Sequence, residues 1–234
     1  MSYTLRSAPT WCAEEELTMD EGTLREAVVA ERRELAGMLG ELTTEQWGAP
    51  SLCAGWRVRE VVAHITMPFR MSVAQFGLEM AKARGNFDRM ADRMARRDTA
   101  RLSDARLLAS LRDNVEHPWR PPGGGTAGAL SHDVIHGLDI SVALGLPRRP
   151  PVERIGLILG SMRDRNVRYF GTDLTGVRLE ATDLDWHLGD GEPLRGSARD
   201  LLLVICGRRI PAELLEGTQA PRYAGRSAGG GDFS

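Results

Sequence analysis

Three histidines in this chain have a spacing that suits metal binding. His132 and His136 are four residues apart in the segment 130–140, whose apolar residues recur at helical intervals. On a helix the two imidazoles would lie on one face, one turn apart, where both can reach the same ion. His64 lies near the middle of a second helix-like segment, 58–65. The pattern indicates a three-histidine site between two helices; the alternative is a set of hydrogen-bonded core histidines, because both segments are otherwise apolar.

Two other side chains near His64 bear on this site. Glu60 precedes His64 by four residues and could orient it or ligate the same ion, but a solvated carboxylate is the favoured interpretation. Cys53 is interpreted as a buried structural cysteine rather than a reactive thiol. Cys12, Cys53 and Cys206 are far apart and form no CxxC pair, so we expect reduced thiols rather than a disulfide framework.

The composition is that of a folded globular protein. The 234 residues are 42% hydrophobic and 26% charged, which fits one large or two small domains. The net charge of −2, with both signs mixed along the chain, provides neither a basic stripe for nucleic acid nor a cationic helix for membranes. The N-terminus lacks the apolar core of a signal peptide, and no apolar run approaches the roughly 18 residues of a membrane span. We therefore expect a cytoplasmic protein without nucleic-acid or membrane partners; its oligomeric state is left open.

Two long helical segments make up the first part of the predicted bundle. The first, over residues 20–42, has Asp20 as its N-cap, and its charged residues, including Arg32, are expected mostly on the solvent side. The second follows a loop at 49–56 and should bend or end at Pro68. Helical character then resumes from Met71 to Lys82.

Residues 86–102 carry several arginines among aspartates: Arg89, Arg93, Arg96 and Arg97 with Asp88, Asp92 and Asp98. The mixture predicts a solvated helical face, with an anion-binding site as the alternative. Ser103 should cap the next helix.

A loop rich in proline and glycine, 119–125, precedes the histidine helix. It is interpreted either as a mobile lip over the histidine site or as a plain connector. Thr126 is expected to cap the histidine helix, and Gly145 with Pro147 to end it.

The C-terminal third changes character. A helix is expected over residues 150–170, followed by a strand pattern from 177, a Gly-Asp-Gly turn at 189–191 and a short return strand at 192–195, which together indicate a hairpin. Ser197 should cap an apolar helix packed against the hairpin.

The sequence thus divides into four parts. These are an irregular segment 1–19, a helical bundle 20–149 with the histidine site, a small α+β domain 150–217 and a disordered tail 218–234. The fold class is mainly α, a helical bundle with a small C-terminal α+β domain.

The motifs at these positions resemble a known family. The segment 52–64, Leu-Cys-Ala-Gly-Trp-Arg-Val-Arg-Glu-Val-Val-Ala-His, followed by a helix with His-Asp-Val-Ile-His-Gly-Leu-Asp, resembles the mycothiol-dependent maleylpyruvate isomerase family, a branch of the DinB-like metalloenzymes. The resemblance runs from about residue 23 to 217. It implies a DinB-like four-helix bundle whose smaller C-terminal domain closes over the metal site.

The same resemblance implies roles for particular residues. His64, His132 and His136 correspond to three zinc ligands from two helices, although the isomerase that names the family has a glutamate where this chain has His132. Asp139 corresponds to a family aspartate that could accept a hydrogen bond from a ligand imidazole or contact the thiol; a capping or solvent-facing role is the alternative. Arg208, or else Arg209, resembles a substrate-anchoring arginine.

The function implied is a mycothiol-using transferase or isomerase. Three neutral imidazoles would leave the charge of Zn²⁺, or of another divalent transition metal, to act on the fourth ligand. A zinc-bound mycothiol thiolate would then attack an electrophilic small molecule. With water in place of the thiol, the same site would make a hydrolase. A non-catalytic metal-binding or ligand-binding bundle is the third interpretation.

Overall fold

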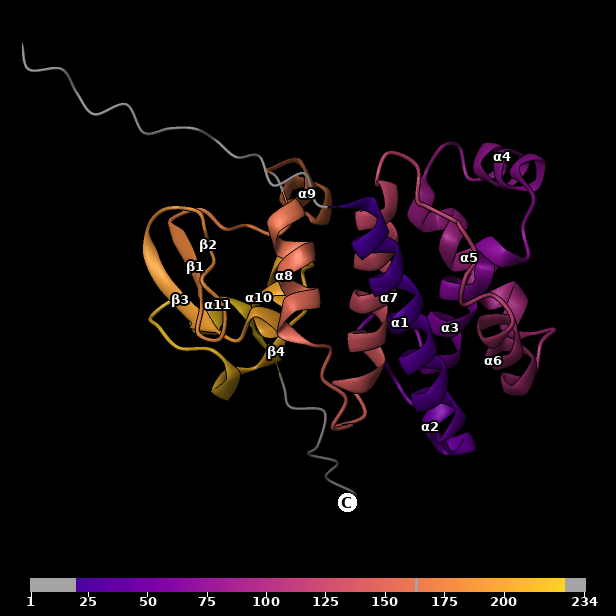
Figure 1. Cartoon of the computed structure of the whole chain (residues 1–234), viewed down its shortest axis with the longest axis horizontal. Coiled ribbons are helices and arrows are strands. Elements are labelled where there is room, and N and C mark those ends of the chain that lie inside the picture. The colour runs from indigo at the N-terminus through magenta and orange to yellow at the C-terminus, as the bar shows by residue number, and fades with distance from the viewer. Residues whose placement is uncertain (1–19, 163, 226–234) are drawn as a thin grey trace, which may run out of the picture.

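The computed structural model describes residues 20–162 and 164–225, and it is mainly helical (Figure 1). Four helices form a bundle, in which α1 and α3 both pack against α6 and α7: α1 (Glu21–Gly40), α3 (Val58–Thr66), α6 (Asp104–Arg112) and α7 (Gly125–Ser141). The short helix α2 (Thr44–Gly48) lies between α1 and α3 in the chain. The predicted mainly α fold with a small C-terminal part that contains strands is confirmed. The expectation for residues 1–19 lies outside the described residues.

Local sequence signals set most bundle boundaries. The carboxylate of Asp20 accepts a hydrogen bond of 3.0 Å from the Thr23 backbone N–H, and the hydroxyl of Ser103 accepts one of 3.3 Å from Arg106, so both predicted N-caps are confirmed. Helix α3 ends at Thr66 and continues as the 3₁₀ turn η1 (Met67–Phe69), as the proline at position 68 requires.

The expected cap of α7 is wrong. The helix begins at Gly125, so Thr126 lies inside the first turn, and its hydroxyl donates to the carboxylate of Glu21 on α1 at 2.5 Å. The N-cap is Gly124, two residues before the expected one, and Gly125 has a φ of +59°, which glycine adopts without strain. The first turn of α7 is therefore tied to α1.

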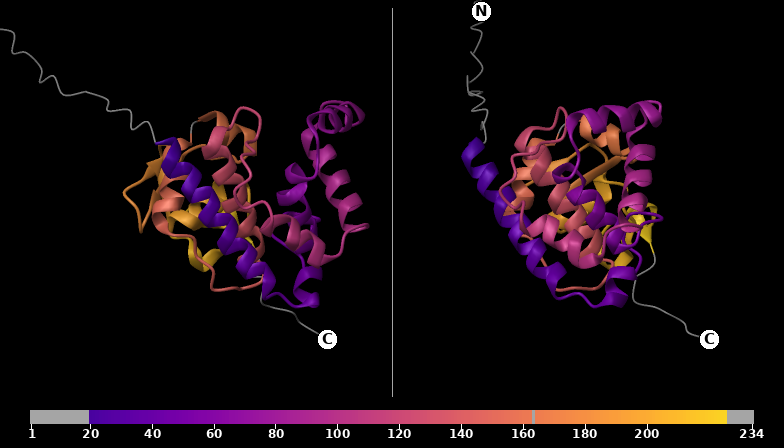
Figure 2. Two further views of the ribbon diagram at one scale, coloured as in Figure 1. Left: turned by 45° about the vertical axis from the view of Figure 1, so that its right-hand side comes forward. Right: turned by 90° about the vertical axis from the view of Figure 1, so that its right-hand side faces the viewer.

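Two further helices lie outside the bundle. Helix α5 (Phe87–Thr99) packs against α3, where its buried Ala95 joins the bundle core. Helix α4 (Val73–Lys82) packs against α5, whose buried Met90 and Met94 form a separate small cluster with Met67 and Ala83. Figure 2 shows α4 and α5 projecting away from the C-terminal part of the molecule.

The C-terminal unit combines helices with a small sheet. Its elements are α8 (Val152–Ser161), α9 (Asp164–Phe170), β1 (Val177–Ala181), β2 (His187–Leu188), β3 (Glu192–Gly196), α10 (Ala198–Ile205), β4 (Ile210–Pro211) and η2 (Ala212–Leu214). The single helix expected over 150–170 is thus two helices. Ser197 caps α10 through the Asp200 backbone N–H at 3.2 Å, as predicted. Helices α8 and α10 lie between the sheet and α7 (Figure 1).

The predicted hairpin is wrong in its pairing. Strand β2 pairs with β1 in antiparallel register, Leu179 opposite Leu188, but β3 runs parallel to β1 on its other edge, Leu179 opposite Leu194. The chain reaches that edge through Gly191, where a Cβ would lie 2.2 Å from the carbonyl oxygen of Gly176. The Gly-Asp-Gly turn therefore lets the backbone cross closely past the start of β1 instead of folding β3 back on β2.

Order also extends past the predicted boundary at residue 217. Residues 220–225 form α11 (Ala220–Tyr223) and β5 (Ala224–Gly225), and β5 pairs in parallel with β4. Tyr223 is buried, and its hydroxyl donates to the Asp173 carbonyl at 2.7 Å. The expected disorder of 218–225 is therefore wrong, and residues 226–234 lie outside the described part.

Helix α7 packs against both the helical bundle and the C-terminal unit. One continuous apolar cluster runs from Leu130 and Val134 on α7 through α8 and α10 to β1, while Ile140 packs into the bundle core on the other side. The histidines on α7 are thus held by a helix that is packed from both sides. No helix in the described ranges has both the length and the apolarity that crossing a bilayer demands.

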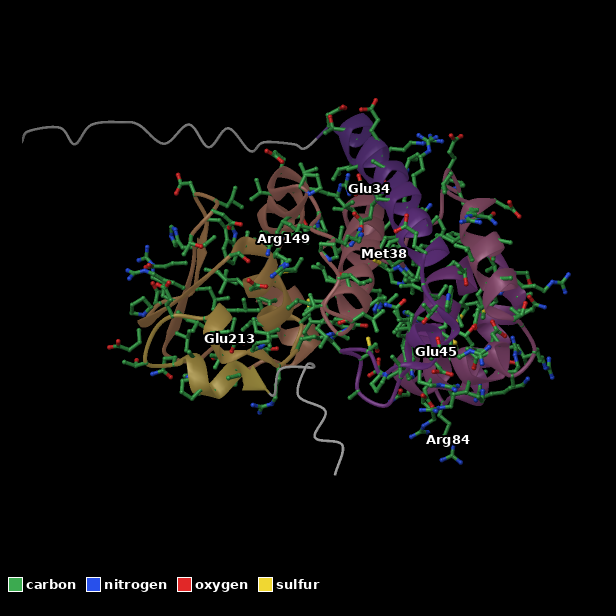
Figure 3. The ribbon with its side chains drawn as sticks, turned by 90° about the horizontal axis from the view of Figure 1, so that it is seen from below. Glu34, Met38, Glu45, Arg84, Arg149 and Glu213 are labelled. Atoms are coloured by element: carbon green, nitrogen blue, oxygen red, sulfur yellow. The ribbon has the colours of Figure 1, made fainter. Side chains whose placement is uncertain are left out.

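A buried ion network fixes the seam between α1 and α8. Glu31, fully buried, accepts hydrogen bonds from Arg148 and, at 2.5 Å, from Arg154, which also binds Glu34. Figure 3 labels Glu34 on α1 and Arg149, just before α8, on the two sides of this seam. Because buried charges need partners, each member depends on the others.

We predict that Glu31→Gln destabilises the protein by about 3 kcal/mol, because it leaves two mostly buried arginines without their shared carboxylate. Urea unfolding measures this change. The control is Arg33→Gln, which breaks an exposed pair with Glu116 and should cost under about 1 kcal/mol. Equal losses in the two variants would contradict the prediction.

Candidate metal centre

The three predicted histidines meet between α3 and α7. The ring centroids of His64, His132 and His136 are 4.9 to 5.1 Å apart, and their ligand atoms all lie within 4.8 Å of one another. The Nε2 atoms of His64 and His132 are 3.3 Å apart. Two nitrogens bound to one tetrahedral zinc ion at about 2.0–2.1 Å are separated by about 3.3 Å. The structure therefore brings the residues together with a spacing that fits a single ion.

A carboxylate and an arginine stand behind His132. Its Nδ1 lies 2.9 Å from Oδ1 of Asp133, and Oδ2 of Asp133 accepts a 2.7 Å bond from Nε of Arg32 on α1. Arg32 is fully buried and also donates to the carbonyl of His117 at 2.7 Å. Because a carboxylate only accepts, the ring proton sits on Nδ1, and Nε2 is left to face the centre.

The same arrangement recurs behind His136. Its Nδ1 lies 3.0 Å from Oδ2 of Asp139, and Asp139 accepts two 2.8 Å bonds from the guanidinium of Arg208, which follows α10. Arg208 also donates to the Cys206 carbonyl at 2.7 Å and lies 3.3 Å from the sulfur of Cys53. The structure thus brings Asp139 and Arg208 to the centre. It places Arg209 at the surface, on the carbonyls of Arg222 and Ala224.

Behind His64 the described residues place no carboxylate. Its ring contacts Trp56 and Phe87 at centroid distances of 5.2 and 6.3 Å, and its Nδ1 is buried with no hydrogen-bond partner among the described residues. Glu60 does not orient it: that carboxylate accepts bonds from Arg57 and from Thr99 at 3.0 Å. Glu60 is only 2% exposed, so the prediction that its carboxylate is solvated is wrong. The carboxylate is buried because it bonds to Thr99 in the contact between α3 and α5.

Burial sets the charge state of the centre. It lowers the pKa of His64 well below the ordinary value, and the neighbouring His136 and His132 lower it further. Burial also lowers the pKa of His136, although its bond to Asp139 acts in the opposite direction. Burial alone would raise the pKa of Asp139, but the bonds from Arg208 and His136 prevail and hold it well below the usual range. The centre therefore favours the neutral form of His64 and His136, with an ionised carboxylate behind His136.

A second group of possible ligands shares His136. Cys53, Asp139 and Nδ1 of His136 also lie within 4.8 Å of one another. The Arg208 guanidinium occupies this place, however, and burial raises the pKa of Cys53, whose thiol donates to Asp139 at 2.9 Å. A cation is therefore better placed among the three Nε2 atoms, and the structural interpretation of Cys53 fits its contacts.

The centre reaches solvent at the edges of two imidazoles. The side chains of His132 and His136 are 14% and 15% exposed, whereas His64 is buried. Trp119, in the loop before α7, stacks edge-on against His132 at a centroid distance of 5.1 Å. The loop thus borders the centre.

Sequence reasoning missed Asp133 and Arg32. Arg32 was expected on the solvent side of α1, but it lies one turn after buried Val28 and one turn before buried Ala36, on the apolar stripe. That spacing could have revealed a buried arginine. Asp133 gave no such signal, because an acid next to a histidine ordinarily points to another helix face.

The fold and centre define a mainly helical protein with a candidate three-histidine metal site. Residues 28–118 match the family model described as "Mycothiol maleylpyruvate isomerase N-terminal domain", which confirms the family resemblance for that segment. Two similar solved structures are the crystal structure of the mycothiol-dependent maleylpyruvate isomerase and that of a mutant of this isomerase in which one histidine is replaced by alanine. They are 13% and 12% identical to this chain, each with a TM-score of 0.47, and the matches cover 89% of this chain and 96% of theirs. No curated protein matches the sequence.

We predict that the chelator-treated protein loses stability as the pH falls below about 6.5. The folded-state pKa values of His64 and His136 are lowered, so the unfolded chain takes up these protons first, and each proton contributes a slope of up to about 1.4 kcal/mol per pH unit. Urea unfolding across this range measures the slope. His64→Gln should reduce it, with His187→Gln on exposed β2 as the matched control. An unchanged slope in His64→Gln would refute the assignment.

Proposed function

We propose that the protein is a metal-dependent transferase or isomerase in which mycothiol attacks an electrophilic small molecule. The observation that carries this proposal is the convergence of three imidazoles with the ring proton of His132 and of His136 directed to a carboxylate. The match of residues 28–118 to the mycothiol maleylpyruvate isomerase N-terminal domain supports mycothiol as the thiol.

The donor set fits a divalent transition metal. Three neutral imidazoles suit zinc and its neighbours in the first transition row, whereas structural zinc sites usually have four protein ligands and often cysteines. Zn²⁺ is the proposed ion, held by His64, His132 and His136. When bound, it would lower the pKa of a neighbouring thiol and so supply a nucleophile at neutral pH.

The surrounding residues fix the orientation of two of the three ligands. Asp133 and Asp139 hold the Nδ1 protons of two imidazoles, and Arg32 and Arg208 fix these carboxylates in turn. Of the five N–H groups of Arg208, the bonds to Asp139, Cys53 and Cys206 use four. These contacts favour Asp139 and Arg208 as positioning residues, in place of the substrate-anchoring role that the resemblance implied for Arg208.

The nucleophilic thiol must come from outside the chain. Cys53 lies beside His136, but burial and the neighbouring Asp139 raise its pKa, so it stays protonated at neutral pH. An external thiol can approach along the exposed rims of His132 and His136, next to Trp119. Conjugated or halogenated small molecules are the substrates that such a thiolate attacks.

Replacing any one of the three histidines with alanine should weaken metal binding by more than tenfold, because two imidazoles make a poorer site than three. Elemental analysis of purified proteins and competition with a zinc chelator measure this loss. His187→Ala, on exposed β2, is the matched control and should retain metal. Full occupancy in His132→Ala and His136→Ala would remove the proposed site.

Turnover should require the added thiol. With monochlorobimane as a model electrophile, we expect the wild-type protein to accelerate formation of the mycothiol thioether and release of chloride, and His136→Ala to fall to the uncatalysed rate. Consumption of ester or amide substrates without any thiol would instead favour the hydrolase, since water would then be the nucleophile.

A further inference from the structure

A cavity of about 390 Å³ lies between α4, α5 and η1, away from the histidine centre. None of the three histidines, nor Asp133, Asp139 or Arg208, lines it. Its volume falls in the range of about 300–1,000 Å³ that is typical of small-molecule sites. It therefore differs in both place and lining from the histidine centre.

The inner part of this cavity is apolar and adaptable. Met67 and Met94 are buried in its floor, Met71 is half-buried beside them, and Leu78 is 55% exposed at the opening. Methionine side chains are flexible and polarizable, so they accommodate apolar groups of different shapes. Such a floor suits a hydrocarbon or aromatic body.

The charged residues around the cavity are mainly cationic. Asp98 accepts bonds from both Arg70 and Arg97, and Glu79 accepts bonds from Lys82 and Arg93. The two carboxylates are therefore already shared among four cations.

Arg101 adds a further positive charge at the opening. It is exposed and has no ion pair among the described residues. Arg97 is exposed beside it, held to Asp98 by bonds longer than 3 Å. The cavity thus presents an excess of positive charge in a chain whose net charge is −2.

We propose that this cavity binds an organic anion with an apolar body, such as a carboxylate or sulfonate on a hydrocarbon or aromatic group. The apolar body lies against Met67, Met71 and Met94, and the anionic group lies between Arg97 and Arg101 at the opening. The sequence of the arginine-rich segment 86–102 favours a solvated helical face, with an anion-binding site as the alternative. Under this proposal, part of the segment binds an anion.

A pair of matched fluorescent probes tests both parts of this proposal. The anion 8-anilinonaphthalene-1-sulfonate and the uncharged N-phenyl-1-naphthylamine share an apolar body, but only the first carries a sulfonate. We expect the anion to bind the full-length wild-type protein more tightly and to lose affinity as the salt concentration rises. Equal affinities for the two probes would overturn the assignment of an anion site.

Variants then locate the bound anion. Arg97→Gln/Arg101→Gln should weaken binding of the anion about three- to tenfold and leave the uncharged probe unchanged, because half-exposed ion pairs contribute modestly. Arg89→Gln makes the same kind of change on an exposed residue of α5 that does not line the cavity, and it should leave both probes unaffected.

A third variant tests the apolar part. Leu78→Glu places a carboxylate at the opening on a side chain that is already exposed, so folding is preserved, and both probes should bind more weakly. Near-UV circular dichroism checks the fold of each variant. Unchanged anion binding in the double arginine variant and in Leu78→Glu would overturn the proposal.

Discussion

Two carboxylates on one helix keep the candidate centre in order. Asp133 and Asp139 of α7 each face an imidazole on one side and a guanidinium on the other, and both are almost fully buried. Without the arginines, two negative charges would be buried without compensation, and without the carboxylates the imidazoles would be free to turn. The stability of the fold and the geometry of the histidines therefore depend on the same contacts.

These contacts also join parts of the chain that are distant in sequence. Arg32 comes from α1, 101 residues before Asp133, and Arg208 follows α10, 69 residues after Asp139. Helix α7 lies between them, packed on one side against the bundle and on the other against α8 and α10. A centre built from two helices is thus supported by the bundle behind His132 and by the C-terminal unit behind His136.

The sequence predicted what depends on local spacing and failed where tertiary contacts decide. The caps at Asp20, Ser103 and Ser197, the break at Pro68 and the convergence of the three histidines follow from short-range pattern or family resemblance. The parallel pairing of β3 did not, because a hairpin and a crossover share the same alternation and turn. The burial of Arg32 and Glu60 was also missed, since a charged residue becomes buried only when partners from other helices meet it.

Arg32 also donates to the backbone carbonyl of His117, at the start of the connection that carries Trp119 to the edge of His132. The guanidinium that anchors Asp133 therefore also anchors one end of this connection, while Pro121 to Gly123 lie beyond the anchored end. A change at Arg32 would therefore disturb the orientation of His132 and the position of this connection together.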